Sequence, residues 1–143
     1  MAQQSPAKLY ALVVGAVLVV AGIIGFFYNS EFTSNESVHD AVFGILNVNG
    51  WHNVVHIVTG VLGLAAFAAG AYAARAYALV LGVVYLAVAI WGFVIGSPDS
   101  ILSVVPINTE DSVLHLALGV LGLLAGLASS APSRAPELGT RPA

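Results

Sequence analysis

The chain has 143 residues, of which 59% are hydrophobic and only 8% are charged, whereas an ordinary soluble domain carries roughly 25% charged residues. A water-soluble globular protein is therefore excluded. Four lysines and arginines stand against seven acids, for a net charge of -3, too few cations for the basic surface that binds nucleic acid, and the absence of cysteine excludes disulfides, thiolate metal sites and iron–sulfur clusters.

Four apolar stretches are long enough to cross a membrane as helices. Crossing roughly 30 Å of hydrocarbon takes about 20 apolar residues, and a helix satisfies its own backbone polar groups. None of the four stretches contains Asp, Glu, Lys or Arg, and we expect the spans at about Leu9 to Tyr28, Val54 to Ala74, Ala76 to Gly96 and Val113 to Ala128.

The charged residues separate onto two sides of the predicted membrane. Six of the seven acids fall in two loops on one side, at about residues 29–50 and 97–111. The four cations fall on the other side, at Lys8, Arg75, Arg134 and Arg141. Because short cytoplasmic loops carry Lys and Arg, we expect a multi-pass plasma membrane protein with both termini in the cytoplasm. Residues 1–7 then form a short N-terminal segment, and residues 129–143 form a flexible tail rich in Pro, Ser and Gly.

The sequence repeats itself. The segment from Lys8 (KLYALVVG) resembles the segment from Arg75 (RAYALVLG) at an offset of 67 residues. The segment from His56 (HIVTGVLGL) resembles the one from His115 (HLALGVLGL) at an offset of 59 residues. The first outer loop is therefore longer than the second.

Both repeats begin on the same side of the membrane, so they are parallel repeats related by a pseudo-twofold axis along the membrane normal. We predict an all-α, integral membrane four-helix bundle made of two helical hairpins. The first repeat covers residues 8–74, with its outer loop at about 29–50, and the second covers residues 75–128, with its outer loop at about 97–111. The symmetry predicts that the two repeated histidines lie at the same depth.

Three features resemble a known family. They are the segment Tyr77–Tyr85 (YALVLGVVY), the segment Asn108–Asp111 (NTED) and the two His-x-x-x-Gly-x-x-Gly-Leu segments. Together they resemble a family of small four-helix membrane proteins, frequent in actinobacteria, that is described only as a domain of unknown function. The resemblance covers about residues 8–128. It implies a four-span architecture and implies no activity.

The paired His-x-x-x-Gly segments are the first candidate for chemistry. Gly60 and Gly119 lie one helical turn from His56 and His115, on nearly the same face. One interpretation is a haem b held by both imidazoles, with the glycines admitting the porphyrin. The other is structural: the glycines let helices approach closely, and each histidine bonds a loop carbonyl or an acid. The sequence favours the structural interpretation and leaves the cofactor open.

A metal ion at the outer face is a second interpretation. His52 and His56 share one helix face at a spacing of four residues, and His39 lies in the adjacent loop among several acids. Such ligands suit zinc or copper. No compact ligand motif is present, however, and position 52 matches Asp111 in the second repeat. Solvated loop charges are the simpler explanation.

Two further polar pairs recur in both repeats. Asn49 and Asn108 each precede a span, where an asparagine side chain caps a helix, and the segment from Asn108 approximates a capping box. Asp40 and Asp99 precede short apolar loop segments. These acids either cap re-entrant or interfacial helical turns, or each holds a histidine as a pair suited to a proton relay.

The predicted function follows from small residues and from the shortage of polar groups inside the spans. Small-residue faces pack helices closely, within the chain or against partners, and here they comprise Gly15, Gly22, Gly82, Ala89, Gly119, Gly122 and Gly126. We expect a non-enzymatic accessory or scaffold subunit, or a homo-oligomer, that contacts lipid and other subunits or itself, and no nucleic acid. The alternatives are a bis-histidine haem b or metal redox protein using His56 and His115, and a small-molecule binder or carrier with an outer-facing cleft.

Overall fold

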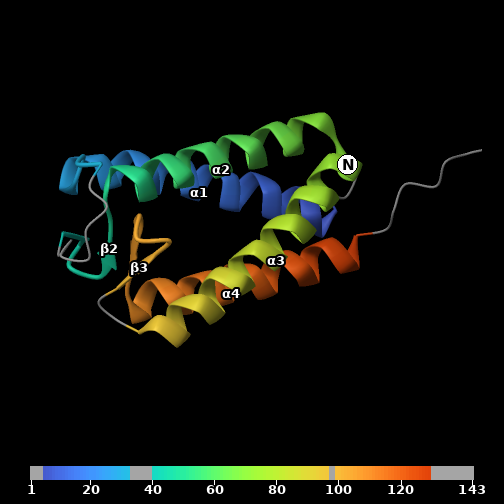
Figure 1. Cartoon of the computed structure of the whole chain (residues 1–143). Coiled ribbons are helices and arrows are strands. Elements are labelled where there is room, and N and C mark those ends of the chain that lie inside the picture. Colours follow the sequence, from blue (N-terminus) through green and yellow to red (C-terminus); the bar gives the residue numbers. More distant parts are fainter. Residues whose placement is uncertain (1–4, 33–39, 97–98, 130–143) are drawn as a thin grey trace, which may run out of the picture.

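The predicted spans are helices that lie side by side in two pairs. The computed structural model describes residues 5–32, 40–96 and 99–129. Helix α1 packs along α2, and α3 packs along α4 (Figure 1). At 1.5 Å per residue, helices of 20 to 25 residues are about 30 Å long or longer, which is enough to cross a bilayer. The protein is an all-α bundle of the multi-pass membrane class, and its helices are α1 (Pro6–Tyr28), α2 (Gly50–Ala69), α3 (Ala71–Ile95) and α4 (Thr109–Ala128).

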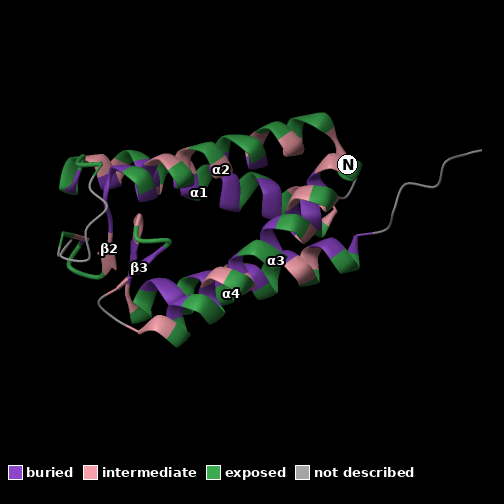
Figure 2. Cartoon of the chain, in the orientation of Figure 1, coloured by how far each residue is buried: buried purple, intermediate pink, exposed green. Residues whose placement is uncertain are grey.

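The surface of the bundle is apolar where a membrane would surround it. Exposed residues lie along the outward faces of the helices (Figure 2). Many of the exposed side chains are large and apolar, among them Val17, Val61, Val80 and Leu124. Such a surface is unfavourable in water, whereas lipid chains are as apolar as the side chains themselves. The buried apolar core is small and lies between α1 and α3, where it contains Ala7, Tyr10, Ala11, Val14, Leu18, Ala74, Ala78, Leu81 and Tyr85.

Two asparagines set the starts of α2 and α4. The Oδ1 atom of Asn49 accepts the backbone N–H of His52, and the Oδ1 atom of Asn108 accepts that of Asp111, each at 2.9 Å. These are the caps that the sequence predicts. Both helices begin before the predicted starts at Val54 and Val113. The prediction missed their first turns because those turns are polar.

The turn between α2 and α3 lies at Gly70, and the sequence-based boundary near Arg75 is wrong. Gly70 has a φ of 110°, a conformation that glycine adopts without steric cost. Arg75 lies inside α3, and its Nε donates to the backbone oxygen of Gly126 on α4 at 3.0 Å. This cation and Lys8, in the first turns of α1, therefore mark the same end of the bundle.

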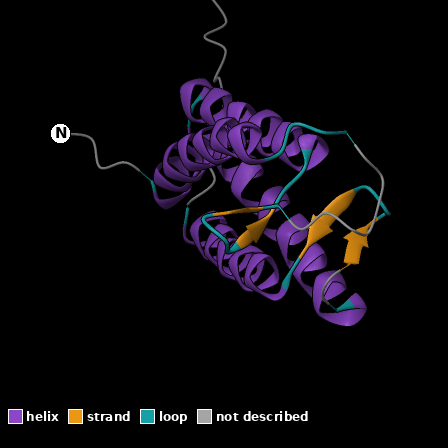
Figure 3. Cartoon of the chain, turned by 90° about the vertical axis from the view of Figure 1, so that its left-hand side faces the viewer, coloured by secondary structure: helices purple, strands orange, loops and turns teal. Residues whose placement is uncertain are grey.

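The two outer loops contain β-hairpins, so the predicted helical turns after Asp40 and Asp99 are wrong. Strand β1 pairs with β2 and strand β3 with β4, both antiparallel. Figure 3 looks onto the end of the bundle that carries both hairpins, and the strands are β1 (Ala41–Val42), β2 (Leu46–Asn47), β3 (Asp99–Ile101) and β4 (Val105–Ile107).

Each hairpin closes through two residues with positive φ. Phe43 and Gly44 have φ of 54° and 72°, and the matching Leu102 and Ser103 have φ of 55° and 57°. Three residues separate the last paired residues of each hairpin, and the first two of them are the central positions of a β-turn, where a turn of the I′ type requires positive φ. This conformation is unusual for side chains as bulky as phenylalanine and leucine, which explains why the sequence pattern indicated helical turns.

Reciprocal hydrogen bonds join the two repeats at the end that carries Lys8 and Arg75. The Tyr10 hydroxyl on α1 donates to the backbone oxygen of Leu118 on α4 at 2.9 Å. The matching Tyr77 hydroxyl on α3 donates to the backbone oxygen of Thr59 on α2 at 3.2 Å. Each tyrosine thus bonds the other repeat at an equivalent position, as a pseudo-twofold axis requires.

The capping asparagines repeat this arrangement at the hairpin end. The Nδ2 of Asn49 donates to the backbone oxygen of Val104 in the second hairpin at 2.7 Å. The Nδ2 of Asn108 donates to the backbone oxygen of Ile45 in the first hairpin at 2.5 Å. Each asparagine side chain therefore caps its own helix with its oxygen and bonds the other repeat's hairpin with its nitrogen.

The small residues bring the helices within each repeat into backbone contact. A Cβ built on Gly60 would lie 2.6 Å from the backbone oxygen of Gly15, which no real structure tolerates. The small residues singled out in the sequence are all buried within the described helices: Gly15, Gly22, Gly82, Ala89, Gly119, Gly122 and Gly126. Their faces are therefore covered by the chain's own helices.

Candidate metal centre

Three histidines from two helices meet close to the hairpin end of the bundle. His52 and His56 lie one turn apart on α2, and His115 lies on α4. All three are buried, with only 2% of His52 exposed. One ring nitrogen from each lies within 4.8 Å of the others. The sequence assigned His52 and His56 to one candidate site and His56 and His115 to another, whereas the structure joins them in a single cluster.

Backbone carbonyls fix the rings of two of these histidines. The Nδ1 of His52 lies 3.0 Å from the backbone oxygen of Asn47, and the Nδ1 of His115 lies 2.7 Å from that of Asp111. Because a carbonyl oxygen only accepts, each Nδ1 carries a hydrogen, and the Nε2 of a neutral ring then presents a lone pair. Metal-binding histidines commonly have this same arrangement, with the second ring nitrogen donating to a carbonyl or carboxylate.

His56 completes the cluster. Its Nε2 lies 3.1 Å from the Nε2 of His52. Since that atom of His52 presents a lone pair, the Nε2 of His56 donates the hydrogen in this contact. A metal ion would take the place of this hydrogen, and His56 would then carry its proton on Nδ1.

Tyr85 on α3 covers the cluster from one side. Its ring stands edge-on to that of His115, with 4.8 Å between the ring centroids. Its hydroxyl is buried, and none of the described residues forms a hydrogen bond with it. A cavity of about 140 Å³ lies beside it and is also lined by the three histidines. The sequence indicated Tyr85 only as the end of the segment that carries the family resemblance.

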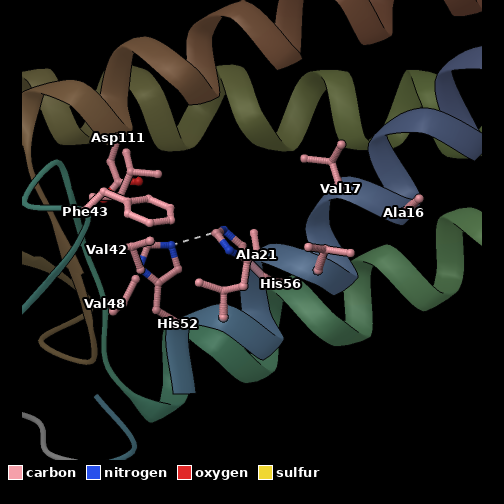
Figure 4. Close-up of a pocket in the computed structure, with 12 residues that line it drawn as sticks. Ala16, Val17, Ala21, Val42, Phe43, Val48, His52, His56 and Asp111 are labelled. Atoms are coloured by element: carbon pink, nitrogen blue, oxygen red, sulfur yellow. Dashed lines mark hydrogen bonds between the residues drawn. The ribbon is translucent and has the colours of Figure 1, made fainter. Parts of the chain in front are cut away.

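Asp111 occupies the position in α4 that His52 occupies in α2. Its side chain is 1% exposed, and neither carboxylate oxygen has a hydrogen-bond partner among the described residues. In Figure 4 it comes from α4 to the end of a cavity where His52 and Phe43 also lie. The repeat alignment already paired Asp111 with His52, and this was the only signal in the sequence that the acid belongs beside the histidines.

The two repeated acids lie apart from the histidines. Asp40 accepts a hydrogen bond from the Nδ2 of Asn29 at 3.0 Å, and Asp99 accepts one from the backbone of Ser100 at 2.6 Å. Among the described residues, neither acid is hydrogen-bonded to a histidine, so the predicted acid–imidazole pairs are wrong. His39, the remaining predicted ligand, lies outside the described residues.

Gly60 and Gly119 do not face an open space beneath the histidines. A Cβ on Gly60 would meet α1 at Gly15 and Val19, and a Cβ on Gly119 would meet α3 at Leu86, each within 3.0 Å. Both glycines therefore serve the contact between paired helices. The haem interpretation, which needs these glycines to admit a porphyrin, loses the argument on which it rested.

Comparison with known proteins adds the family and no activity. No curated protein and no solved structure shows detectable similarity to the chain. The family DUF4383, a domain of unknown function, matches residues 8–128, which include both hairpins, the three histidines and the four helices of the described chain except for the first two residues of α1. The chain belongs to the DUF4383 family.

Proposed function

We propose that the protein is a membrane-embedded binding protein for a transition-metal dication, held by His52, His56 and His115. The observation that carries the proposal is the convergence of three imidazole nitrogens, two of them oriented by backbone carbonyls. Imidazole ligands suit zinc, copper, nickel and iron, whereas calcium and magnesium prefer oxygen. The proposal assigns binding to the site and no catalytic step.

The spacing of the ring nitrogens supports this proposal. Two nitrogens bound to zinc at about 2.0–2.1 Å in a tetrahedron lie roughly 3.3 Å apart. The Nε2 atoms of His52 and His56 are 3.1 Å apart, close to that separation. The nitrogen of His115 lies within 4.8 Å of both, so it needs to move by only about 1.5 Å to bind the same ion. Three protein ligands leave a fourth position open.

The accessory-subunit hypothesis has less support from the structure. It rested on small-residue faces that a partner helix could use, and in the described helices those faces are buried within the chain. The bis-histidine haem hypothesis relied on glycines that face an open space, and these glycines pack against other helices. The positions of the buried side chains favour the metal centre.

Metal binding is tested by titrating Co²⁺ into the full chain, purified in detergent with an affinity tag that contains no histidine. We expect one Co²⁺ per chain, with the visible absorption of a nitrogen-bound, tetrahedral ion, and displacement by Zn²⁺. The double variant His52→Ala with His56→Ala is expected to lose this absorption. A wild-type chain that binds neither ion would refute the proposal.

We also propose that the end carrying Lys8 and Arg75 faces the cytoplasm, because short cytoplasmic loops carry the positive charges. The chain has no cysteine, so a single introduced cysteine reports its side of the membrane. In spheroplasts, a membrane-impermeant maleimide is expected to label Glu110→Cys, beside the hairpins, at least about tenfold faster than Tyr72→Cys, beside the α2–α3 turn. After lysis the two rates should become similar. Faster labelling of Tyr72→Cys in intact spheroplasts would reverse the orientation.

A further inference from the structure

A cavity lies between α1, the first hairpin and the histidine cluster. Its volume is about 390 Å³, within the range of small-molecule sites. Its wall is apolar: Val17, Val20 and Ile24 contribute from α1, and Val42 and Phe43 contribute from the hairpin. The hydrocarbon part of a small molecule therefore fits this space.

The cavity borders the lipid-facing surface of the bundle. Val17 and Val20 line it and are also 55% and 54% exposed on the outer face of α1. The space between α1 and the hairpin is therefore reached from the hydrocarbon region, so that a molecule dissolved in the membrane has access without crossing water.

The opposite end of the cavity is polar because of Asp111. Its two carboxylate oxygens are buried and have no hydrogen-bond partner in the part of the chain that the structure describes, which is costly for a carboxylate unless a donor or a cation satisfies it. The two histidines at the same end do not bond its carboxylate, because their hydrogen bonds run to each other and to the backbone of Asn47. The carboxylate of Asp111 thus lies at the polar end of a cavity whose walls are otherwise apolar (Figure 4).

The equivalent cavity in the second repeat differs from this one in size and in its polar group. The matching space beside α3 measures about 140 Å³ and is lined by Tyr85 and Val88, where α1 has Leu18 and Ala21. At its polar end the second cavity has His52 in the position that Asp111 takes in the first. The first cavity therefore combines smaller wall residues with a carboxylate.

We infer that this cavity binds a membrane-soluble amphiphile whose head donates a hydrogen bond to Asp111 and whose apolar body lies along α1. An ammonium or a hydroxyl group supplies such a donor, and the ammonium also neutralises the carboxylate. The inference does not depend on a metal ion at the histidines, and the experiment is run both with Zn²⁺ and with a chelator.

Photo-crosslinking in phosphatidylcholine nanodiscs tests the inference on the full chain. Three ten-carbon diazirine probes are compared: an ammonium, an alcohol, and a methyl ether that has no donor. We expect the ammonium to label α1 between Ala16 and Ile24 at least about tenfold more than the ether does, and labelling by the alcohol shows whether a neutral donor suffices. Equal labelling by all three probes would mean a crevice filled by lipid chains only, and would overturn the inference.

Two variants and a matched control locate the head and the body of the ligand. Asp111→Asn removes the charge and is expected to lower ammonium labelling about tenfold, whereas Glu110→Gln, at the neighbouring exposed carboxylate, leaves it unchanged. Ala21→Phe fills the cavity and is expected to lower labelling by every probe. Unchanged ammonium labelling in a folded Asp111→Asn chain would contradict the assignment of the head group. Loss of Co²⁺ binding with retained probe labelling would refute the metal centre alone.

Discussion

Replacing His115 with alanine is expected to lower the affinity of the protein for Zn²⁺ at least about 100-fold. Loss of an outer-shell partner alone typically costs 10–100-fold in metal affinity, and here a direct ligand is removed. His115 is the informative choice because it comes from α4, whereas the other two histidines lie one turn apart on α2. The measurement is a competition titration between the protein and a chromophoric zinc chelator.

The matched control for this experiment is His39→Ala. His39 was a predicted ligand and lies outside the described residues. A centre held by His52, His56 and His115 alone predicts that replacing His39 leaves zinc affinity unchanged. Circular dichroism and gel filtration establish that both variants fold. If His115→Ala binds zinc as tightly as the wild type, the α2 pair binds the ion alone and the three-ligand centre is wrong.

Replacing Gly60 with alanine is expected to lower the free energy of unfolding by about 2 kcal/mol or more. The added Cβ would lie 2.6 Å from the backbone oxygen of Gly15 and 2.7 Å from the backbone nitrogen of Val19, and backbone atoms cannot rotate away as a side chain can. Alanine gains about 1 kcal/mol of helix propensity over glycine, so the clash must exceed that gain. Unfolding in mixed micelles of increasing SDS content measures the difference.

Gly126→Ala in α4 is the control for that variant. Its added Cβ would meet the side chain of Leu79 at 2.6 Å, while the nearest backbone atom is 3.4 Å away. A leucine side chain can change rotamer, so we expect less than half the loss seen for Gly60→Ala. Equal losses in the two variants would show that backbone contact between α1 and α2 is not what makes Gly60 necessary.

The spans and their symmetry could be predicted because lipid imposes a simple rule on composition. Each helix must be apolar over about 20 residues, and the predicted limits of the first span at Tyr28 and of the fourth at Ala128 agree with α1 and α4. The helix limits that were predicted wrongly lie at polar or small residues. The first turns of α2 and α4 contain polar residues, and the turn at Gly70 is followed by an α3 that includes Arg75.

The hairpins could not be predicted because their turns contain bulky residues that are rare at turn positions with positive φ. Gly44 is an ordinary turn residue, but Phe43 and Leu102 have positive φ, which bulky side chains rarely adopt. The capping asparagines hold these hairpins across the repeats, through Val104 and Ile45. Contacts of this kind join residues far apart in the chain, and no local sequence pattern reports them.

The histidine cluster was predicted only in parts. The sequence placed His52 on one helix face with His56 but assigned it to an outer-face metal site, separate from the pair of His56 and His115. Which histidines meet follows from how the two repeats pack together, and tyrosine and asparagine hydrogen bonds join the repeats. The cavity beside the cluster depends on the position of the hairpin, which the sequence did not indicate.

The reciprocal hydrogen bonds have a consequence for how far the two repeats can differ. Tyr10 and Tyr77, like Asn49 and Asn108, make the same bond in opposite directions, as residues do across an isologous interface between two identical subunits. In such a homodimer every position carries the same residue in both subunits. Because both repeats here belong to one chain, equivalent positions can carry different residues, and one such pair is His52 in the first repeat and Asp111 in the second.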